Sequence, residues 1–200
     1  MIITIDGFSC QGKSYFGKKV AEKLGIEHLS TGLIFRFVVC EYGKMLNENI
    51  DFNSYIILQK ALDKLDQTDL HTLIFQKELK QPFTEKYLHE VSPYHSIILP
   101  RLQKRLLEYV KDKNFVLDGR FTFQIFPEAK RKYYFQSSVE ERASLLSTIK
   151  NITFNEAVDY IRYRDSIEEI FHIPNDVRLI NPFSFTEKTL MDYLMRDIEE

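Results

Sequence analysis

A phosphate-binding motif near the N-terminus constrains this 200-residue chain more than any other feature of its sequence. The run Gly7-Phe-Ser-Cys-Gln-Gly12-Lys13-Ser14 matches the pattern G-x-x-x-x-G-K-[ST]. The β-branched run Ile2–Ile5 predicts a buried strand before the motif, and a helical pattern begins near Lys13. Because this loop binds nucleotide phosphates when it joins a strand to a helix, the sequence predicts a P-loop α/β domain. A glycine-rich turn without phosphate would not explain why lysine and serine follow at a helix start.

Each residue type in the motif has a chemical reason. Glycines let the backbone amides turn toward the phosphates, and the helix N-terminus adds its own positive end. Lys13 places a point charge on the β- and γ-phosphates, and the Ser14 hydroxyl can ligate Mg²⁺. The motif therefore predicts ATP and Mg²⁺ as cofactors. The predicted ATP-binding residues are Gly7, Ser9, Cys10, Gln11, Gly12, Lys13, Ser14 and Tyr15.

Strand and helix patterns alternate along most of the chain and predict the fold class. Further strands are expected at Ile26–Leu29, Phe115–Leu117, Lys132–Phe135 and Val177–Ile180. Helical patterns separate these strands, which is typical of a doubly wound parallel sheet, here of about five strands, flanked by helices. Ligands of such sheets bind at the carboxyl ends of the strands.

The middle of the chain has a less regular pattern. Ile56–Leu65 is predicted to be a helix, and Leu70–Phe75 alternates enough to predict a strand in a hairpin. Two further helices, His89–Ile98 and Pro100–Val110, are predicted to be joined or kinked at the proline.

Composition excludes several classes of function. The formal net charge is −2, with 27 basic and 29 acidic residues, which argues against a nucleic-acid binder that neutralises many phosphates. No run of eighteen apolar residues occurs, so no membrane span is expected. Cys10 and Cys40 lack the spacing of a metal site, so a reducing, cytoplasmic environment is expected. The scattered histidines lack the paired spacing of a zinc site, and His28 in the second strand is interpreted as structural.

An ordered series of motifs gives the chain a family resemblance. Besides the phosphate loop these are Ser30-Thr-Gly-Leu-Ile-Phe-Arg36, Val116-Leu-Asp118-Gly119-Arg120, Phe126-Pro127-Glu128-Ala129, Glu140-Glu141-Arg142-Ala143 and Ile161-Arg-Tyr-Arg164-Asp165. In this order they resemble the cytidylate kinases, a family of nucleoside monophosphate kinases, over essentially the whole chain. The resemblance implies transfer of the ATP γ-phosphate to a small nucleotide acceptor by a monomeric, single-domain enzyme. It also implies a core at 1–44, 111–138 and 173–200, a nucleotide-monophosphate (NMP) binding subdomain at about 45–110, and a mobile lid at about 139–172.

The same resemblance implies roles for individual residues. Ser14 and Asp118 would bind Mg²⁺, and the catalytic cations would be Lys13, Arg120, Arg142 and Arg164. The acceptor-binding residues would be Thr31, Arg36, Ser96, Gln103, Asp118, Arg120, Phe121, Arg164 and Glu168. Transfer between two anions needs fixed cations around both, and arginines suit phosphate oxygens, although a surface ion pair is the alternative for each arginine.

Departures from the family pattern fall on the base-reading and lid positions. Phe121 stands where cytidylate kinases have an aspartate, and Gln103 stands where they have an arginine. At least three lid cations are missing after Ala143 and Asp165. These departures favour a different base or a modified pyrimidine as acceptor. The alternatives are a degenerate nucleotide-binding regulator and a kinase for another small acceptor.

Overall fold

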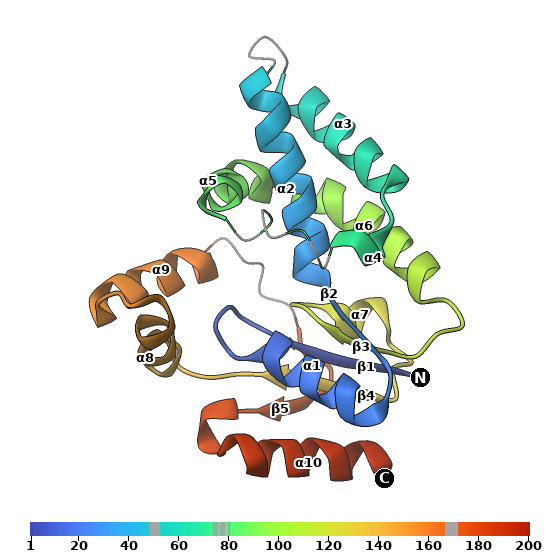
Figure 1. The fold of residues 1–200 in the computed structure, drawn as a ribbon, viewed down its shortest axis with the longest axis vertical. Coiled ribbons are helices and arrows are strands. Elements are labelled where there is room, and N and C mark those ends of the chain that lie inside the picture. Colours follow the sequence, from blue (N-terminus) through green and yellow to red (C-terminus); the bar gives the residue numbers. More distant parts are fainter. Residues whose placement is uncertain (49–52, 74–75, 77–78, 80, 167–171) are drawn as a thin grey trace. The chain divides into compact units, whose positions relative to one another are not determined.

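The computed structural model describes residues 1–48, 53–73, 76, 79, 81–166 and 172–200 (Figure 1). The chain divides into two compact units. Unit 1 combines Met1–Leu29 with Lys113–Glu200, and unit 2 is the continuous segment Ser30–Asp112. Each unit is described by itself.

A five-stranded sheet forms the centre of unit 1 (Figure 1). Its strands, in the order β2-β3-β1-β4-β5, are β2 (Glu27–Ser30), β3 (Phe115–Asp118), β1 (Ile2–Gly7), β4 (Arg131–Phe135) and β5 (Arg178–Ile180). The central strand β1 pairs in parallel with both β3 and β4, and β4 pairs in parallel with β5. Strands buried on both faces of a parallel sheet need continuous apolar runs, which explains the pattern of Ile2–Ile5. This sheet confirms the predicted P-loop α/β fold.

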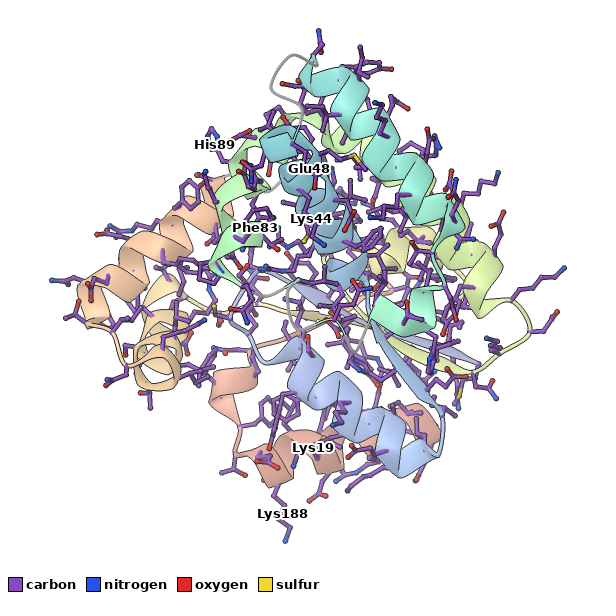
Figure 2. The ribbon with its side chains drawn as sticks, turned by 45° about the horizontal axis from the view of Figure 1, so that its top comes forward. Lys19, Lys44, Glu48, Phe83, His89 and Lys188 are labelled. Atoms are coloured by element: carbon purple, nitrogen blue, oxygen red, sulfur yellow. The ribbon has the colours of Figure 1, made fainter. Side chains whose placement is uncertain are left out.

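Helices of unit 1 cover the sheet and extend from it. They are α1 (Lys13–Leu24), α7 (Thr122–Ile125), α8 (Val139–Lys150), α9 (Phe154–Ser166) and α10 (Glu187–Glu199), with a 3₁₀ turn at Pro182–Ser184. Ile3 and Ile5 of β1 pack in one apolar cluster with Val20 of α1 and Leu194 of α10. Lys19 on α1 pairs with Glu187 at the start of α10, and Figure 2 labels Lys19 and the neighbouring Lys188. These two helices therefore share one face of the sheet.

Sequence signals at the ends of these helices match the structure. Gly25 ends α1 in a left-handed conformation with φ of 64°. Ser138 forms a capping box with Glu141 at the start of α8. Thr186 caps α10 in the same way.

The described part of unit 2 is helical. Its elements are α2 (Thr31–Glu48), α3 (Ser54–Gln67), α4 (Leu70–Leu73), α5 (Pro82–Val91), the 3₁₀ turn η2 (Ser92–Tyr94) and α6 (His95–Val110). Helix α2 packs against α3 and α5, and Figure 2 labels Lys44 and Glu48 on α2 and Phe83 and His89 on α5. A side chain at Gly43 would lie 2.3 Å from the ring of Tyr87, so glycine permits the close approach of α2 and α5. No helix among the described residues is long and apolar enough to cross a membrane.

One sequence-based prediction for this segment is wrong. Leu70–Leu73 forms a helix and not a strand, because Asp69 accepts hydrogen bonds from the amide of His71 and from Thr72, and the two leucines are buried at helical spacing. Pro100, the predicted junction or kink between two helices, lies inside the single helix α6. The chain is interrupted earlier, at the 3₁₀ turn that contains Pro93.

Candidate nucleotide-binding site

The phosphate loop has a backbone that only particular residues allow. Gly7 ends β1 with φ of 135°, and a Cβ there would lie 2.2 Å from the carbonyl oxygen of Phe135 on β4. Gly12 precedes α1 with φ of 77°, and Cys10 at the tip of the loop also has a positive φ of 63°. The two motif glycines therefore shape the loop through conformation and close approach.

Two predicted catalytic cations contact the loop directly. Lys13 Nζ donates to the Phe8 carbonyl at 2.5 Å, and Arg120 Nη2 donates to Ser9 Oγ at 3.0 Å. Both side chains are half-buried. The side chains of Lys13 and Arg120 therefore place positive charge at the phosphate loop without a bound nucleotide.

The two other predicted cations come from the helical pair α8 and α9. Arg142, 2% exposed, donates to both carboxylate oxygens of Asp165 at 2.9 and 2.6 Å, and its Nη1 lies 3.4 Å from the Ser9 carbonyl. Arg164 is 6% exposed and donates to Tyr160. Both arginines are therefore buried, and Arg142 already has an anionic partner.

Cys10 connects the loop tip to this helical pair. It packs against a small apolar cluster of α8 and α9 that contains Ala143 and Ile161. Burial raises the pKa of the Cys10 thiol, and the charges of Lys13, Arg164 and Arg142 oppose that rise without cancelling it. Arg142 and Arg120 also contact the neighbouring loop residue Ser9, the first at its carbonyl and the second at its hydroxyl.

A carboxylate lies beside the first residues of α1. Ser14 Oγ donates to Asp118 Oδ1 at 2.8 Å, and His28 Nε2 lies 2.7 Å from Asp118 Oδ2. The predicted metal-binding pair is therefore together. Sequence reasoning treated His28 as structural and missed its contact with Asp118. The strand order predicts this contact, because β2 and β3, which carry His28 and Asp118, are neighbours in the sheet.

Asp6 is a second residue that sequence reasoning missed. It is fully buried on β1 and accepts hydrogen bonds from the amide and hydroxyl of Thr122, both at 2.7 Å, and from the amide of Phe123 at 3.0 Å. Burial raises its pKa to about 6, against the opposing effect of these hydrogen bonds and of Lys13. Asp6 thereby anchors the start of α7, directly after Arg120.

The remaining predicted ATP-binding residues differ in their surroundings. Gln11 is 1% exposed, and neither polar atom of its side chain has a hydrogen-bond partner among the described residues. Such an arrangement costs about 1–3 kcal/mol for each buried group. Tyr15 is 49% exposed on α1, where the Lys19 ammonium lies 4.8 Å from the centre of its ring. Its side chain is therefore on the outer surface of that helix.

The predicted acceptor-binding residues are spread over several elements. Arg36 on α2 donates to the Leu79 carbonyl at 3.1 Å and pairs with Glu85 of α5 at 2.5 Å. The others are Thr31 at the start of α2, the exposed Ser96 and half-buried Gln103 on α6, and the half-buried Phe121 before α7. Glu168 lies outside the described residues. Arg36 is therefore already bound to a carboxylate.

The donor atoms suit the groups that the phosphate loop implies. A hydroxyl and a carboxylate are hard oxygen ligands of the kind that Mg²⁺ takes in nucleotide sites, where substrate phosphates supply the rest. Lysine and arginine nitrogens directed at the loop suit polyphosphate oxygens. These residues therefore fit Mg²⁺ together with a nucleoside triphosphate.

Comparison with known proteins agrees with this arrangement. The family described as cytidylate kinase matches residues 3–170. A cytidylate kinase of Borrelia turicatae is 31% identical over 184 residues, covering 84% of this chain and 81% of the relative. One from Caldanaerobacter subterraneus is 27% identical over 99% of this chain and 94% of its own length. The crystal structure of an uncharacterized protein from Eubacterium ventriosum shares the fold, with a TM-score of 0.55, 13% identity, and coverage of 100% of this chain and 98% of that chain.

The family match covers most of the chain, and the phosphate loop, strand order and Ser14–Asp118 pair are all present within it. The resemblance inferred from the motifs is confirmed: the chain belongs to the cytidylate kinase family of nucleoside monophosphate kinases.

Proposed function

We propose that this protein transfers the γ-phosphoryl group of ATP to a nucleoside monophosphate. One observation carries the proposal. Lys13, Arg120 and Arg142 contact the phosphate loop directly, and Arg164 lies on α9, the helix that packs against the α8 helix of Arg142. Phosphoryl transfer depends on positioning and on charge stabilisation, so cations at this loop matter more than a nucleophilic side chain.

The proposed donor side consists of the loop Gly7–Ser14 and the carboxylate beside it. Loop amides and Lys13 would bind the β- and γ-phosphates. Ser14 and Asp118 would hold Mg²⁺, which neutralises charge on the phosphate oxygens when it is bound. The Lys13 ammonium, now on the Phe8 carbonyl, would turn to the phosphates.

In the proposed transfer, an oxygen of the acceptor's phosphate forms a bond to the γ-phosphorus. The bond from that phosphorus to the bridging β–γ oxygen breaks, and ADP leaves. Arg120, Arg142 and Arg164 would stabilise the negative charge that spreads over the γ-phosphoryl oxygens. For Arg142 this requires a partial exchange of Asp165 for phosphate oxygens.

The proposed acceptor side uses unit 2. Thr31 and Arg36 would bind the acceptor's phosphate, with Arg36 exchanging Glu85 for it. We infer that the NMP-binding subdomain at about 45–110 lies within this unit, and that α8 and α9 belong to the lid. The monomeric state and cytoplasmic location are proposed on family grounds alone.

The acceptor's base is proposed to differ from ordinary cytosine. Phe121 and Gln103 stand where the family has an aspartate and an arginine, so a charged donor–acceptor pair is replaced by a ring and an amide. Hydrogen-bond readout of a base edge discriminates strongly, and its loss changes which base is accepted. A modified pyrimidine or another base fits these two residues better.

A second candidate function is nucleotide binding without turnover. Two of the predicted cations are neutralised by the protein's own carboxylates, Arg142 by Asp165 and Arg36 by Glu85. Charge that is already compensated stabilises a transferring phosphoryl group less. A regulatory protein of this kind would bind ATP tightly and release no ADP.

Calorimetry and an ADP-release assay test both candidates. We expect heat when Mg²⁺–ATP is titrated into the protein, and ADP release with one or more members of a panel of nucleoside monophosphates. Lys13→Ala should abolish both, while Lys18→Ala, whose side chain is 70% exposed on α1, should change neither. Binding without turnover on any acceptor would favour the second candidate. The absence of heat with folded wild-type protein would exclude both.

A further inference from the structure

The contact between His28 and Asp118 joins two neighbouring strands at the proposed metal site. His28 lies on β2 and Asp118 ends β3. The distance between Nε2 and Oδ2 is 2.7 Å, and His28 donates this hydrogen bond when Nε2 carries the proton. The other carboxylate oxygen, Oδ1, accepts from Ser14 at 2.8 Å. Each oxygen of Asp118 therefore has a partner from a different element, which restrains the carboxylate.

Packing fixes the imidazole ring as well. A Cβ built on Gly17 of α1 would lie 3.0 Å from Nε2 and 3.2 Å from Cδ2 of His28, so the ring lies directly against this glycine. The side chain of Asp118 is 4% exposed and that of His28 is 19% exposed. Three elements, α1, β2 and β3, thus meet at one buried hydrogen bond. A carboxylate as buried as this needs such partners.

A purely structural role would explain the burial but not the direction of the contact. The ring holds the oxygen of Asp118 that faces away from Ser14. The oxygen that faces Ser14 is thereby held beside the hydroxyl that we assign to Mg²⁺. Partners behind a metal-binding carboxylate orient it, and their loss typically lowers metal affinity or activity about 10- to 100-fold.

We propose that His28 is a positioning residue of the donor site: it holds the Asp118 carboxylate so that its Oδ1 edge and the Ser14 hydroxyl together face a Mg²⁺ ion bound with ATP. This inference rests on the proposed function. It concerns the contribution of the metal to ATP binding and leaves the loop's direct contacts with the phosphates unchanged.

The ratio of two dissociation constants tests the proposal. Calorimetry gives the ATP dissociation constant in EDTA and in saturating Mg²⁺, and the ratio measures what the metal adds. His28→Phe keeps a ring against Gly17 but has no hydrogen-bond donor. For this variant we expect the ATP dissociation constant in Mg²⁺ to rise about tenfold or more. The value in EDTA should stay within about twofold. Gln places an amide nitrogen near the position of Nε2, so His28→Gln should restore most of the ratio.

Control variants separate this role from a structural one. His89→Ala, an exposed histidine on α5 (Figure 2), should behave as wild type in both conditions. His28→Ala should behave like His28→Phe, and where it does not fold the Phe and Gln variants decide. An unchanged ratio in His28→Phe, with a lowered melting temperature, would overturn the proposal. Wild-type protein that binds no ATP in Mg²⁺ would instead overturn the proposed function.

Discussion

Arg120 of unit 1 and Arg36 of unit 2, two of the predicted phosphate-site arginines, have different partners. In unit 1, Arg120 donates to a hydroxyl of the phosphate loop, so its charge is not compensated by that contact. In unit 2, Arg36 pairs with the carboxylate of Glu85 and with a backbone carbonyl. The donor side therefore places positive charge on its loop in advance, whereas the acceptor side holds its arginine against an internal anion.

Buried carboxylates show the same contrast. Asp6 in unit 1 accepts from neutral donors, and burial raises its pKa to about 6. For Glu41 in unit 2 burial also raises the pKa, but hydrogen bonds from Lys64 and Lys44 outweigh it and leave the pKa below its usual value. Neutral groups thus hold Asp6, whereas two lysines hold Glu41. Four experiments test this comparison.

The largest effect is expected from removing Arg120, which donates to Ser9 of the phosphate loop. Arg120→Ala should lower kcat about 10³-fold, because the transferring charge loses an arginine while the fold keeps its core. Steady-state kinetics with the acceptor found in the panel measures this. The exposed Arg196→Ala on α10 serves as control and should retain wild-type kcat. A loss below about tenfold would show that Arg120 is not a cation of the transfer step.

The next effect concerns the buried ion pair of α8 and α9. Arg142→Ala leaves the Asp165 carboxylate without its bidentate partner and should destabilise this helical pair by about 3 kcal/mol. Amide hydrogen exchange over Val139–Ser166 measures the local stability. Arg162→Ala, an exposed arginine on α9, should leave exchange unchanged. If Arg142→Ala also leaves it unchanged, the pair has no structural role and Arg142 is more accessible to substrate than its burial indicates.

The third prediction uses pH to compare the buried carboxylates. The pKa of Asp6 is raised from 3.8 to about 6 in the folded protein. The stability that its protonated form contributes is therefore fully present below about pH 3.8 and is lost as pH rises through 6. The shift corresponds to about 3 kcal/mol. The lowered pKa of Glu41 acts in the opposite direction, giving stability above about pH 4.5 that is lost as pH falls.

Denaturant unfolding between pH 3 and 7 tests these opposite signs. The difference in unfolding free energy between wild type and Asp6→Asn should decrease as pH rises. The difference between wild type and Glu41→Gln should increase over the same range. Slopes of the same sign would contradict the contrast between the two units.

The smallest effect is expected at the acceptor arginine. Glu85→Gln should lower the KM for the acceptor about two- to fivefold, because phosphate no longer competes with a carboxylate whose side chain is 30% exposed. The KM for ATP should not change. An increase in acceptor KM would show that Glu85 orients Arg36 productively and does not compete with the acceptor.

Local motifs explain how much of the fold and site could be predicted from the sequence. The phosphate loop and the caps of α8 and α10 depend on residues a few positions apart, so their patterns can be recognised in the sequence. The contact between His28 and Asp118 joins residues 90 positions apart and follows only from the strand order.

Unit 2 was harder to predict because helix packing determines it. The pairing of Arg36 with Glu85 depends on how α2 lies against α5, which no spacing in the sequence specifies. The helix Leu70–Leu73 is capped by Asp69, but the alternating apolar pattern of this segment favours a strand. Propensity is a weak guide where tertiary contacts decide.

Gly7 has a consequence for how this site can change over evolutionary time. Its φ of 135° and the 2.2 Å approach of the Phe135 carbonyl close that position to every side chain. The obstacle is backbone on a neighbouring strand and cannot rotate away as a side chain could. At the tip of the loop, the side chains of Phe8 and Cys10 contact α8 and α9, although Cys10 also has a positive φ of 63°. Substitutions at the tip can therefore change how the loop packs against these helices, whereas Gly7 at the start of the loop has to stay glycine.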